Sequence, residues 1–161
     1  MSFFTLFAKD AKAPRTPREK IMRPGLKDNI PPIMREPDPR LDEVVRKVIG
    51  AAINVHRELG PGYPEKIYAN ALDIEMQSLG ITFQRELEIP IRYKNTLVGE
   101  AFIDFYVDNA LVVEIKAVED LLPVHTSQVI SYLKATGNHL GLLINFDVRI
   151  LKDGVKRVVR S

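Results

Sequence analysis

Hydrophobic residues recur at helical spacing along the first regular part of the chain. From Leu41 to Leu59 they lie three or four positions apart, and the pattern stops at the Gly-Pro-Gly string that starts at Gly60. A second helical pattern opens near Pro64, a residue suited to a first helical position, and runs as far as Gly80. We therefore predict two consecutive helices joined by a short loop.

The pattern then changes to the alternation and short apolar runs that are typical of strands. One more helix is predicted from Pro123 to about Thr136, and turns are predicted at Lys94-Asn95 and at Asp108-Asn109. Helices that flank a mixed sheet make an α/β fold with one main core. The predicted strands cover residues 81–85, 88–93, 98–107, 111–116, 140–146 and 155–159.

Residues 1–40 differ from the rest in composition. They hold seven of the eleven prolines, and nine Lys and Arg residues against five Asp and Glu. Proline fixes φ and removes a backbone donor, so we predict an irregular, basic, Pro-rich N-terminal extension followed by one domain over residues 41–161. The extension is either a plain leader, which we favour, or an arm that contacts nucleic acid.

The overall composition is that of an ordinary globular protein. The 161 residues include 45% hydrophobic residues and no cysteine, which excludes disulfides and thiolate metal sites and fits a cytoplasmic protein. No apolar run approaches the roughly 18 residues of a membrane span. Residues 41–161 carry fourteen basic against sixteen acidic side chains, so composition alone does not indicate a nucleic-acid binder.

Three charged residues interrupt the two most apolar strand segments. Asp104 lies within residues 102–107, and Glu114 and Lys116 lie within residues 111–116. Both segments are apolar on both faces, as expected of central strands covered from two sides. Because a buried, unpaired charge costs several kcal/mol, these groups must serve one another or a bound ion.

The loop between these strands decides whether the three groups meet. A three-residue loop places Asp104 opposite Glu114, whereas a two-residue loop places the carboxylates on opposite faces of the sheet. Paired carboxylates beside a lysine suit Mg²⁺ or Mn²⁺, which retain waters and accept phosphate oxygens. The plainer alternative is a buried ion pair without chemistry.

Two further strings accompany this trio. Gly62 to Tyr68 reads GxxExxY at the start of the second predicted helix, and Gln128 to Tyr132 reads QxxxY in the third. With the segments 55–62, 142–146 and 151–157, the chain resembles the bacterial GxxExxY protein family over about residues 41–161. That family is placed in the PD-(D/E)XK nuclease superfamily, so the resemblance implies a restriction-endonuclease-like core with a mixed central β-sheet flanked by helices.

The resemblance also implies roles for individual residues. The superfamily pattern places its metal ligands on Asp104, Glu114 and the backbone carbonyl of Ile115, with Glu65 adding a carboxylate or holding a metal-bound water. Lys116 would position the attacking water. Pro64 stands where an apolar residue is more usual in the family, which would shift Glu65 slightly. The expected catalytic residues are Asp104, Glu114, Lys116, Glu65, Gln128 and Tyr132.

We therefore expect Mg²⁺- or Mn²⁺-dependent hydrolysis of phosphodiesters in nucleic acid, favouring DNA. A non-catalytic nucleic-acid-binding or assembly module that keeps the fold is the alternative, and a small regulatory or toxin-like protein acting with a partner is a third. The histidines have plainer roles: we expect His56 in the core, His125 at a helix cap and His139 at a turn.

Overall fold

The first helix starts at the boundary of the described chain. The structure, a computed structural model, describes residues 38–161; the predicted extension lies outside the described residues as far as residue 37. Helix α1 spans Pro39–Leu59, two residues longer than predicted at its start. The Asp38 side chain accepts a hydrogen bond from the Arg40 backbone N–H at 3.0 Å, and Pro39 occupies the first turn, where it loses no hydrogen bond.

Helices α1 and α2 are joined by the predicted loop. Gly60 ends α1 with a φ of 68°, a conformation that favours glycine. Helix α2 spans Glu65–Ser78 and begins one residue later than predicted. Pro64 has a ψ of 149°, so it is the extended residue that precedes the helix, and Glu65 becomes the first helical residue.

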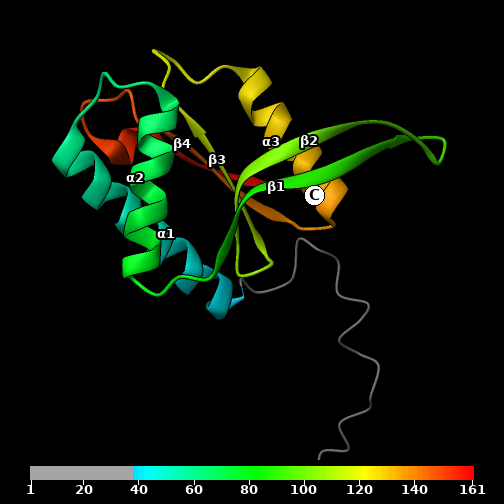
Figure 1. The fold of residues 1–161 in the computed structure, drawn as a ribbon, viewed down its shortest axis with the longest axis horizontal. Helices are drawn as coiled ribbons and strands as arrows, with labels where there is room; N and C mark the ends of the chain where they lie inside the picture. The colour runs from blue at the N-terminus through cyan, green and yellow to red at the C-terminus, as the bar shows by residue number, and fades with distance from the viewer. Residues whose placement is uncertain (1–37) are drawn as a thin grey trace, which may run out of the picture. The chain divides into compact units, whose positions relative to one another are not determined.

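The remaining elements form a five-stranded sheet with a third helix (Figure 1). The strand order is β1-β2-β3-β4-β5; β3 and β4 are parallel, and every other neighbouring pair is antiparallel. This mixed sheet confirms the predicted α/β class. The elements are β1 (Phe83–Tyr93), β2 (Thr96–Val107), β3 (Leu111–Lys116), α3 (Pro123–Thr136), β4 (Leu140–Asn145), a 3₁₀ turn η2 (Leu151–Gly154) and β5 (Val155–Val159).

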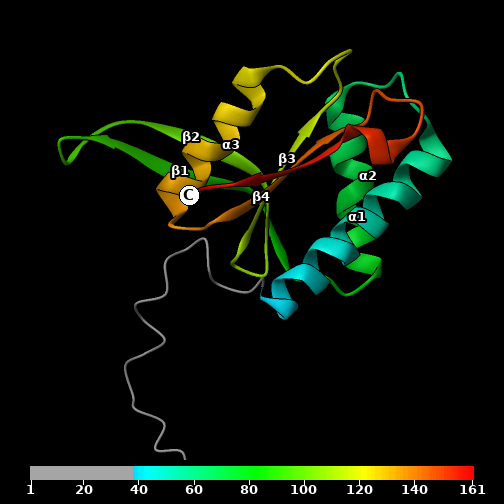
Figure 2. The same cartoon turned by 180° about the vertical axis from the view of Figure 1, so that it is seen from behind.

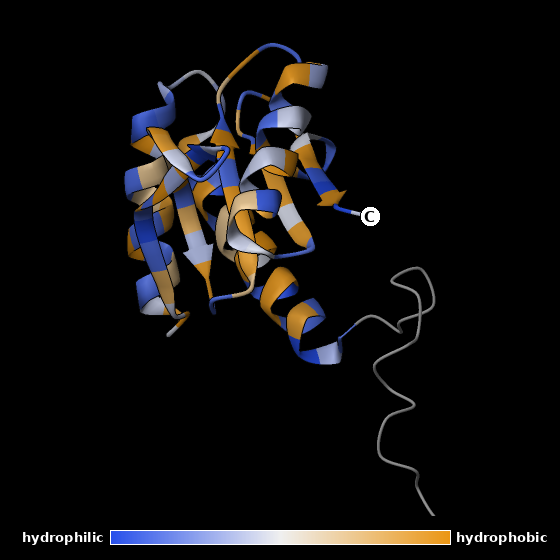
Figure 3. Ribbon diagram, turned by 90° about the vertical axis from the view of Figure 1, so that its right-hand side faces the viewer, coloured by the Kyte–Doolittle hydropathy of each residue, from blue (hydrophilic) through white to orange (hydrophobic). Residues whose placement is uncertain are grey.

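Helices cover both faces of the sheet. Helices α1 and α2 pack on one face and α3 on the other, as the two opposite views show (Figures 1 and 2). Every residue of β4 and all of β3 except Lys116 are buried, and hydrophobic residues dominate these central strands (Figure 3). No helix of residues 38–161 is long and apolar enough to cross a membrane.

One prediction about the strands is wrong. Residues 83–93 form a single strand, with a break in regular pairing at Glu86, whose φ is 51°. Arg85 pairs with Phe105 and Leu87 with Ile103 on either side of this break. Beyond it the inward face changes, because Phe105 packs in the core under α1 and α2 whereas Ile103 packs in the core under α3. The distal hairpin thereby turns toward α3.

Candidate active site

The loop between β2 and β3 has the length that brings the two carboxylates together. Val107 pairs with Leu111, so three residues lie between the strands, and Asp108 and Asn109 adopt φ values of 50° and 52°. Asp and Asn tolerate this left-handed conformation better than most residues. The register, continued from the Phe105–Val113 pair, places Asp104 across from Glu114.

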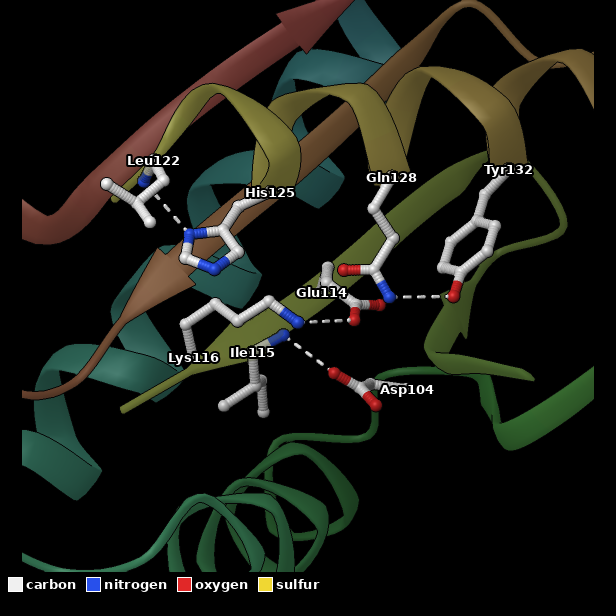
Figure 4. Close-up of polar contacts among 8 residues, drawn as sticks. All are labelled: Asp104, Glu114, Ile115, Lys116, Leu122, His125, Gln128 and Tyr132. Carbon is white, nitrogen blue, oxygen red and sulfur yellow. Dashed lines mark hydrogen bonds and ion pairs between the residues drawn. The ribbon is translucent and has the colours of Figure 1, made fainter. Parts of the chain in front are cut away.

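Asp104 lies where β2 leaves β3. Backbone pairing between these strands ends at Phe105 and Val113. Beyond that point the Asp104 Oδ2 atom accepts a hydrogen bond from the Ile115 backbone N–H at 2.7 Å (Figure 4). The carboxylate therefore takes the place of a main-chain acceptor, and its side chain points toward the edge of β3 rather than into either core.

Glu114 and Lys116 form a largely buried ion pair on the face of β3 that α3 covers. The Lys116 Nζ atom donates to Glu114 Oε1 at 3.0 Å, and only 4% of the Glu114 side chain is exposed. The second carboxylate oxygen, Oε2, is buried and has no hydrogen-bond partner among the described residues. A buried carboxylate oxygen without a partner is costly, which makes this atom the most unusual feature of the site.

The electrostatics of the site favour an added positive charge. Burial and the nearby Asp104 carboxylate raise the pKa of Glu114 to about 7. Burial likewise raises the pKa of Asp104, although its hydrogen bond from Ile115 opposes the shift. Burial acts to lower the pKa of Lys116, but the carboxylates of Glu114, Glu65 and Asp104 together outweigh burial and the pKa is raised. Lys116 is therefore charged at neutral pH, and it balances only part of the negative charge.

Glu65 extends the site from the start of α2. Its side chain is exposed, yet partial burial raises its pKa, while Lys116 lowers it and Asp104 raises it. This mutual influence places Glu65 in the same electrostatic environment as the ion pair. Among residues 38–161, however, no three Asp, Glu or His side chains gather into a ready-made metal cluster.

Gln128 and Tyr132 approach the same site from α3. The Gln128 Nε2 atom donates to the Tyr132 hydroxyl at 2.9 Å, and both side chains lie beside Glu114 in Figure 4. Burial raises the pKa of Tyr132, and the Glu114 carboxylate adds to the shift. The Tyr132 hydroxyl therefore keeps its proton and can donate it in a hydrogen bond.

The hydrogen bonds of the histidines are made outside this centre, although the His125 ring lies beside Lys116 in Figure 4. His125 Nδ1 accepts from the Leu122 backbone N–H at 3.0 Å, as expected for a residue that caps α3 (Figure 4). His56 is buried, and its Nε2 atom is hydrogen-bonded to the Val148 carbonyl at 2.8 Å. His139 is exposed, with Nδ1 lying 3.4 Å from the Arg160 carbonyl.

Comparison with known proteins agrees with this geometry. Residues 42–158 match the sequence pattern of the PD-(D/E)XK nuclease superfamily. The chain belongs to the PD-(D/E)XK nuclease superfamily. Neither a curated protein nor a solved structure matches the chain significantly. Membership points to nuclease activity, to a nucleic-acid substrate and to the use of a divalent metal, without naming the ion or the substrate.

The donor set of this PD-(D/E)XK domain fits a hard divalent cation. Asp104, Glu114 and Glu65 carry three carboxylates against the single ammonium of Lys116, so full ionisation leaves a charge of −2. The partnerless Oε2 atom of Glu114 provides a buried oxygen donor. The Ile115 N–H points toward β2. In a strand, the carbonyl of a residue points to the same side as its own N–H, so the Ile115 carbonyl faces β2 as well. Oxygen donors of this kind suit Mg²⁺ or Mn²⁺.

Two residues that shape the PD-(D/E)XK site gave little signal in the sequence. Glu86 lies opposite Asp104 at the break in β1, and its charge helps to raise the pKa of Asp104. Asn145 is buried at the end of β4, and its side chain accepts from the Val118 N–H at 3.1 Å and donates to the Val118 carbonyl at 2.7 Å. It thereby fixes the loop that follows Lys116. A strongly apolar context around Asn145 was the one available clue.

Proposed function

We propose that this protein hydrolyses phosphodiester bonds in nucleic acid, favouring DNA, with Mg²⁺ or Mn²⁺ as cofactor. The observation that carries the proposal is the buried Oε2 atom of Glu114, which has no hydrogen-bond partner within residues 38–161, while Oε1 pairs with Lys116 and Asp104 lies across the strands. A purely structural ion pair needs no second carboxylate at this position. Superfamily membership supports the same reaction class.

The metal would be held by Asp104, by Glu114 and by the backbone carbonyl of Ile115, with Glu65 acting through a bound water. When bound, a divalent ion supplies Lewis-acid stabilisation of the phosphate and lowers the pKa of a water. Asp104 also holds the Ile115 backbone through its hydrogen bond. The Asp104 carboxylate would therefore be one ligand itself and would also orient the Ile115 carbonyl, which is another.

Lys116 contributes positive charge in this arrangement and does not act as a base. Its pKa is raised by Glu114, so the ammonium group is protonated at neutral pH and has three protons to donate. We infer that it orients the attacking water and stabilises the negative charge that develops on the phosphate oxygens. Its position two residues from Glu114 on one strand face keeps it within reach of the same phosphorus.

Gln128 and Tyr132 would position the substrate. Their hydrogen bond restrains both side chains on one face of α3, beside the ion pair (Figure 4). The protonated Tyr132 hydroxyl and the Gln128 carboxamide are both neutral donors, suited to a phosphate oxygen that flanks the cleaved bond. We also propose that the chain is a cytoplasmic bacterial protein of the GxxExxY family, in which Glu65 supplies the acidic residue of the string.

The experiment that tests the proposal is a cleavage panel. Single- and double-stranded DNA and RNA are incubated with the full chain and Mg²⁺, Mn²⁺ or EDTA. Lys116→Ala is the test variant, and Lys47→Ala is the matched control, because Lys47 forms an exposed ion pair with Glu43 on α1. We expect metal-dependent cleavage of DNA that Lys116→Ala reduces at least about 100-fold and Lys47→Ala leaves unchanged.

The panel also tests the competing function. A non-catalytic nucleic-acid-binding or assembly module would bind the same oligonucleotides without cutting any of them in either metal. Cleavage that survives Lys116→Ala at the wild-type rate would instead point to a contaminating nuclease and contradict the assignment.

A further inference from the structure

A cluster of positively charged side chains lies apart from the candidate active site. Arg57, Arg149 and Lys152 line a pocket of about 270 Å³ whose other walls are mainly apolar. All three side chains are exposed. The pocket's remaining lining residues are Ile53, His56, Ile150 and Leu151.

The three cations are not neutralised by acidic neighbours. None of them takes part in an ion pair with another described residue. The acidic residues nearest in sequence, Glu58, Asp147 and Asp153, do not line the pocket. His56 lines it, but its Nε2 atom is already engaged by the Val148 carbonyl. Within residues 38–161, the pocket is therefore lined by three cations and by no acidic side chain, in a domain that is slightly acidic as a whole.

The end of helix α1 explains the position of Arg57 but not the positions of Arg149 and Lys152. Arg57 lies in the last turn of α1, where a cation complements the negative end of the helix. Arg149 and Lys152 belong to the loop and the 3₁₀ turn that follow β4, and neither side chain pairs with an acidic group among residues 38–161. These two residues lie almost a hundred positions from Arg57 in the sequence. The charge at the end of α1 does not explain why they line the same pocket.

The pocket and the candidate active site lie at the same end of the domain. Lys116 is in register with Asn145 on the neighbouring parallel strand, and Arg149 follows four residues later. Adjacent strands are about 4.8 Å apart and each residue spans at most about 3.8 Å, so the Cα atoms of Lys116 and Arg149 lie within roughly 20 Å. The loops after β3, β4 and α1 cluster at this end in both views (Figures 1 and 2).

We propose that Arg57, Arg149 and Lys152 bind backbone phosphates of the nucleic acid on one flank of the cleaved bond. This inference rests on the proposed function and extends it to the substrate's path. One strand of a duplex carries a phosphate every 3.4 Å or so along the axis, so a separation of up to about 20 Å spans up to about six base pairs. The substrate is therefore a polymer that reaches beyond the scissile phosphate, rather than a dinucleotide.

The test is the salt dependence of binding, measured in EDTA so that no cleavage takes place. The full chain is titrated into a fluorescent DNA duplex of about 30 base pairs, at salt concentrations from about 50 to 200 mM. The test variant is Arg149→Ala/Lys152→Ala. The control is Arg46→Ala/Lys47→Ala, which removes the same charge from exposed positions in the first half of α1.

We expect the slope of log affinity against log salt to fall by about 2 in the test variant and to stay unchanged in the control. Equal slopes in the two variants, whether reduced or not, would overturn the inference. Competition by millimolar inorganic phosphate that depends on Arg149 and Lys152, without a change in the DNA slope, would show an isolated anion site and would overturn it too.

Cleavage is measured separately with Mg²⁺ and Mn²⁺, so that the two proposals fail independently. If the slope changes as expected but the wild-type protein cuts nothing, only the proposed function is wrong. If the wild-type protein cleaves DNA and the test variant keeps its salt slope, only the role of the basic pocket is wrong.

Discussion

The Asp104 carboxylate accepts a hydrogen bond from the Ile115 backbone N–H at 2.7 Å, at the point where strand β2 diverges from β3. A side chain thus replaces the main-chain acceptor that a continuing β2 would have offered. The same carboxylate lies across from Glu114, and the same residue, Ile115, separates Glu114 from Lys116. The Asp104 side chain therefore both supports the edge of β3 and contributes negative charge to the site.

These two roles of Asp104 can be separated by substitution. Asp104→Asn keeps an oxygen acceptor for the Ile115 N–H but removes the charge, whereas Asp104→Ala removes both. We expect the Ala variant to lose about 1–3 kcal/mol of unfolding free energy, because it leaves a partly buried N–H without its acceptor. The Asn variant should lose less than 1 kcal/mol, while both variants lose metal-dependent cleavage. Chemical denaturation and the cleavage assay measure the two effects, and equal destabilisation by Asn and Ala would contradict the structural role.

The raised pKa of Glu114 predicts how stability changes with pH in the absence of metal. Its pKa is about 7 in the folded protein against 4.5 when unperturbed, so the folded state binds the proton more tightly than the unfolded state does. The free energy of unfolding should therefore fall as pH rises from about 4.5 to about 7, by about 2–3 kcal/mol.

Glu114→Gln is the matching variant for this pH effect. The neutral carboxamide cannot ionise, so the decline between these pH values should be much smaller, with the raised pKa values of Asp104 and Glu65 accounting for the remainder. Denaturant unfolding in EDTA at several pH values measures it. A variant whose pH profile coincides with that of the wild-type protein would rule out Glu114 as the source.

Glu86 is predicted to set the direction of the distal hairpin and hence the position of Asp104. Its φ of 51° is unfavourable for most side chains, and glycine adopts it without strain. Glu86→Gly should keep or raise stability by up to about 1 kcal/mol, whereas Glu86→Val should lower it by about 1–2 kcal/mol, because β-branched residues resist this conformation. Thermal unfolding of both variants tests this. If Val were tolerated as well as Gly, the break in β1 would not depend on the backbone conformation.

The helices and central strands could be predicted from the sequence because their signals are strong. The helical spacing of apolar residues from Leu41 ends at glycine, and residues 111–116 are apolar except for Glu114 and Lys116. The charged trio stood out for the same reason. An ionic group in a buried strand is costly unless something compensates for it.

The details that complete the site depend on backbone conformations with weaker signals. Glutamate is not a residue that signals a left-handed backbone, so Glu86 looked like a gap between two strands rather than a break within one. Asp108 and Asn109 were compatible with a two-residue or a three-residue loop. In the structure Val107 pairs with Leu111, so the loop has three residues. The pocket formed by Arg57 and Arg149 joins residues far apart in sequence, which no local pattern reveals.

The most direct test of the central claim is calorimetric titration of Mn²⁺ into the full chain and into the Asp104→Asn/Glu114→Gln variant. Removal of two carboxylate charges should abolish binding at this site. We predict saturable binding by the wild-type protein, with a higher unfolding temperature in Mn²⁺ because a ligand that binds only the folded state stabilises it. Neither effect should appear in the double variant. A double variant that binds Mn²⁺ as tightly as the wild-type protein, or a wild-type protein that binds none, would contradict the account.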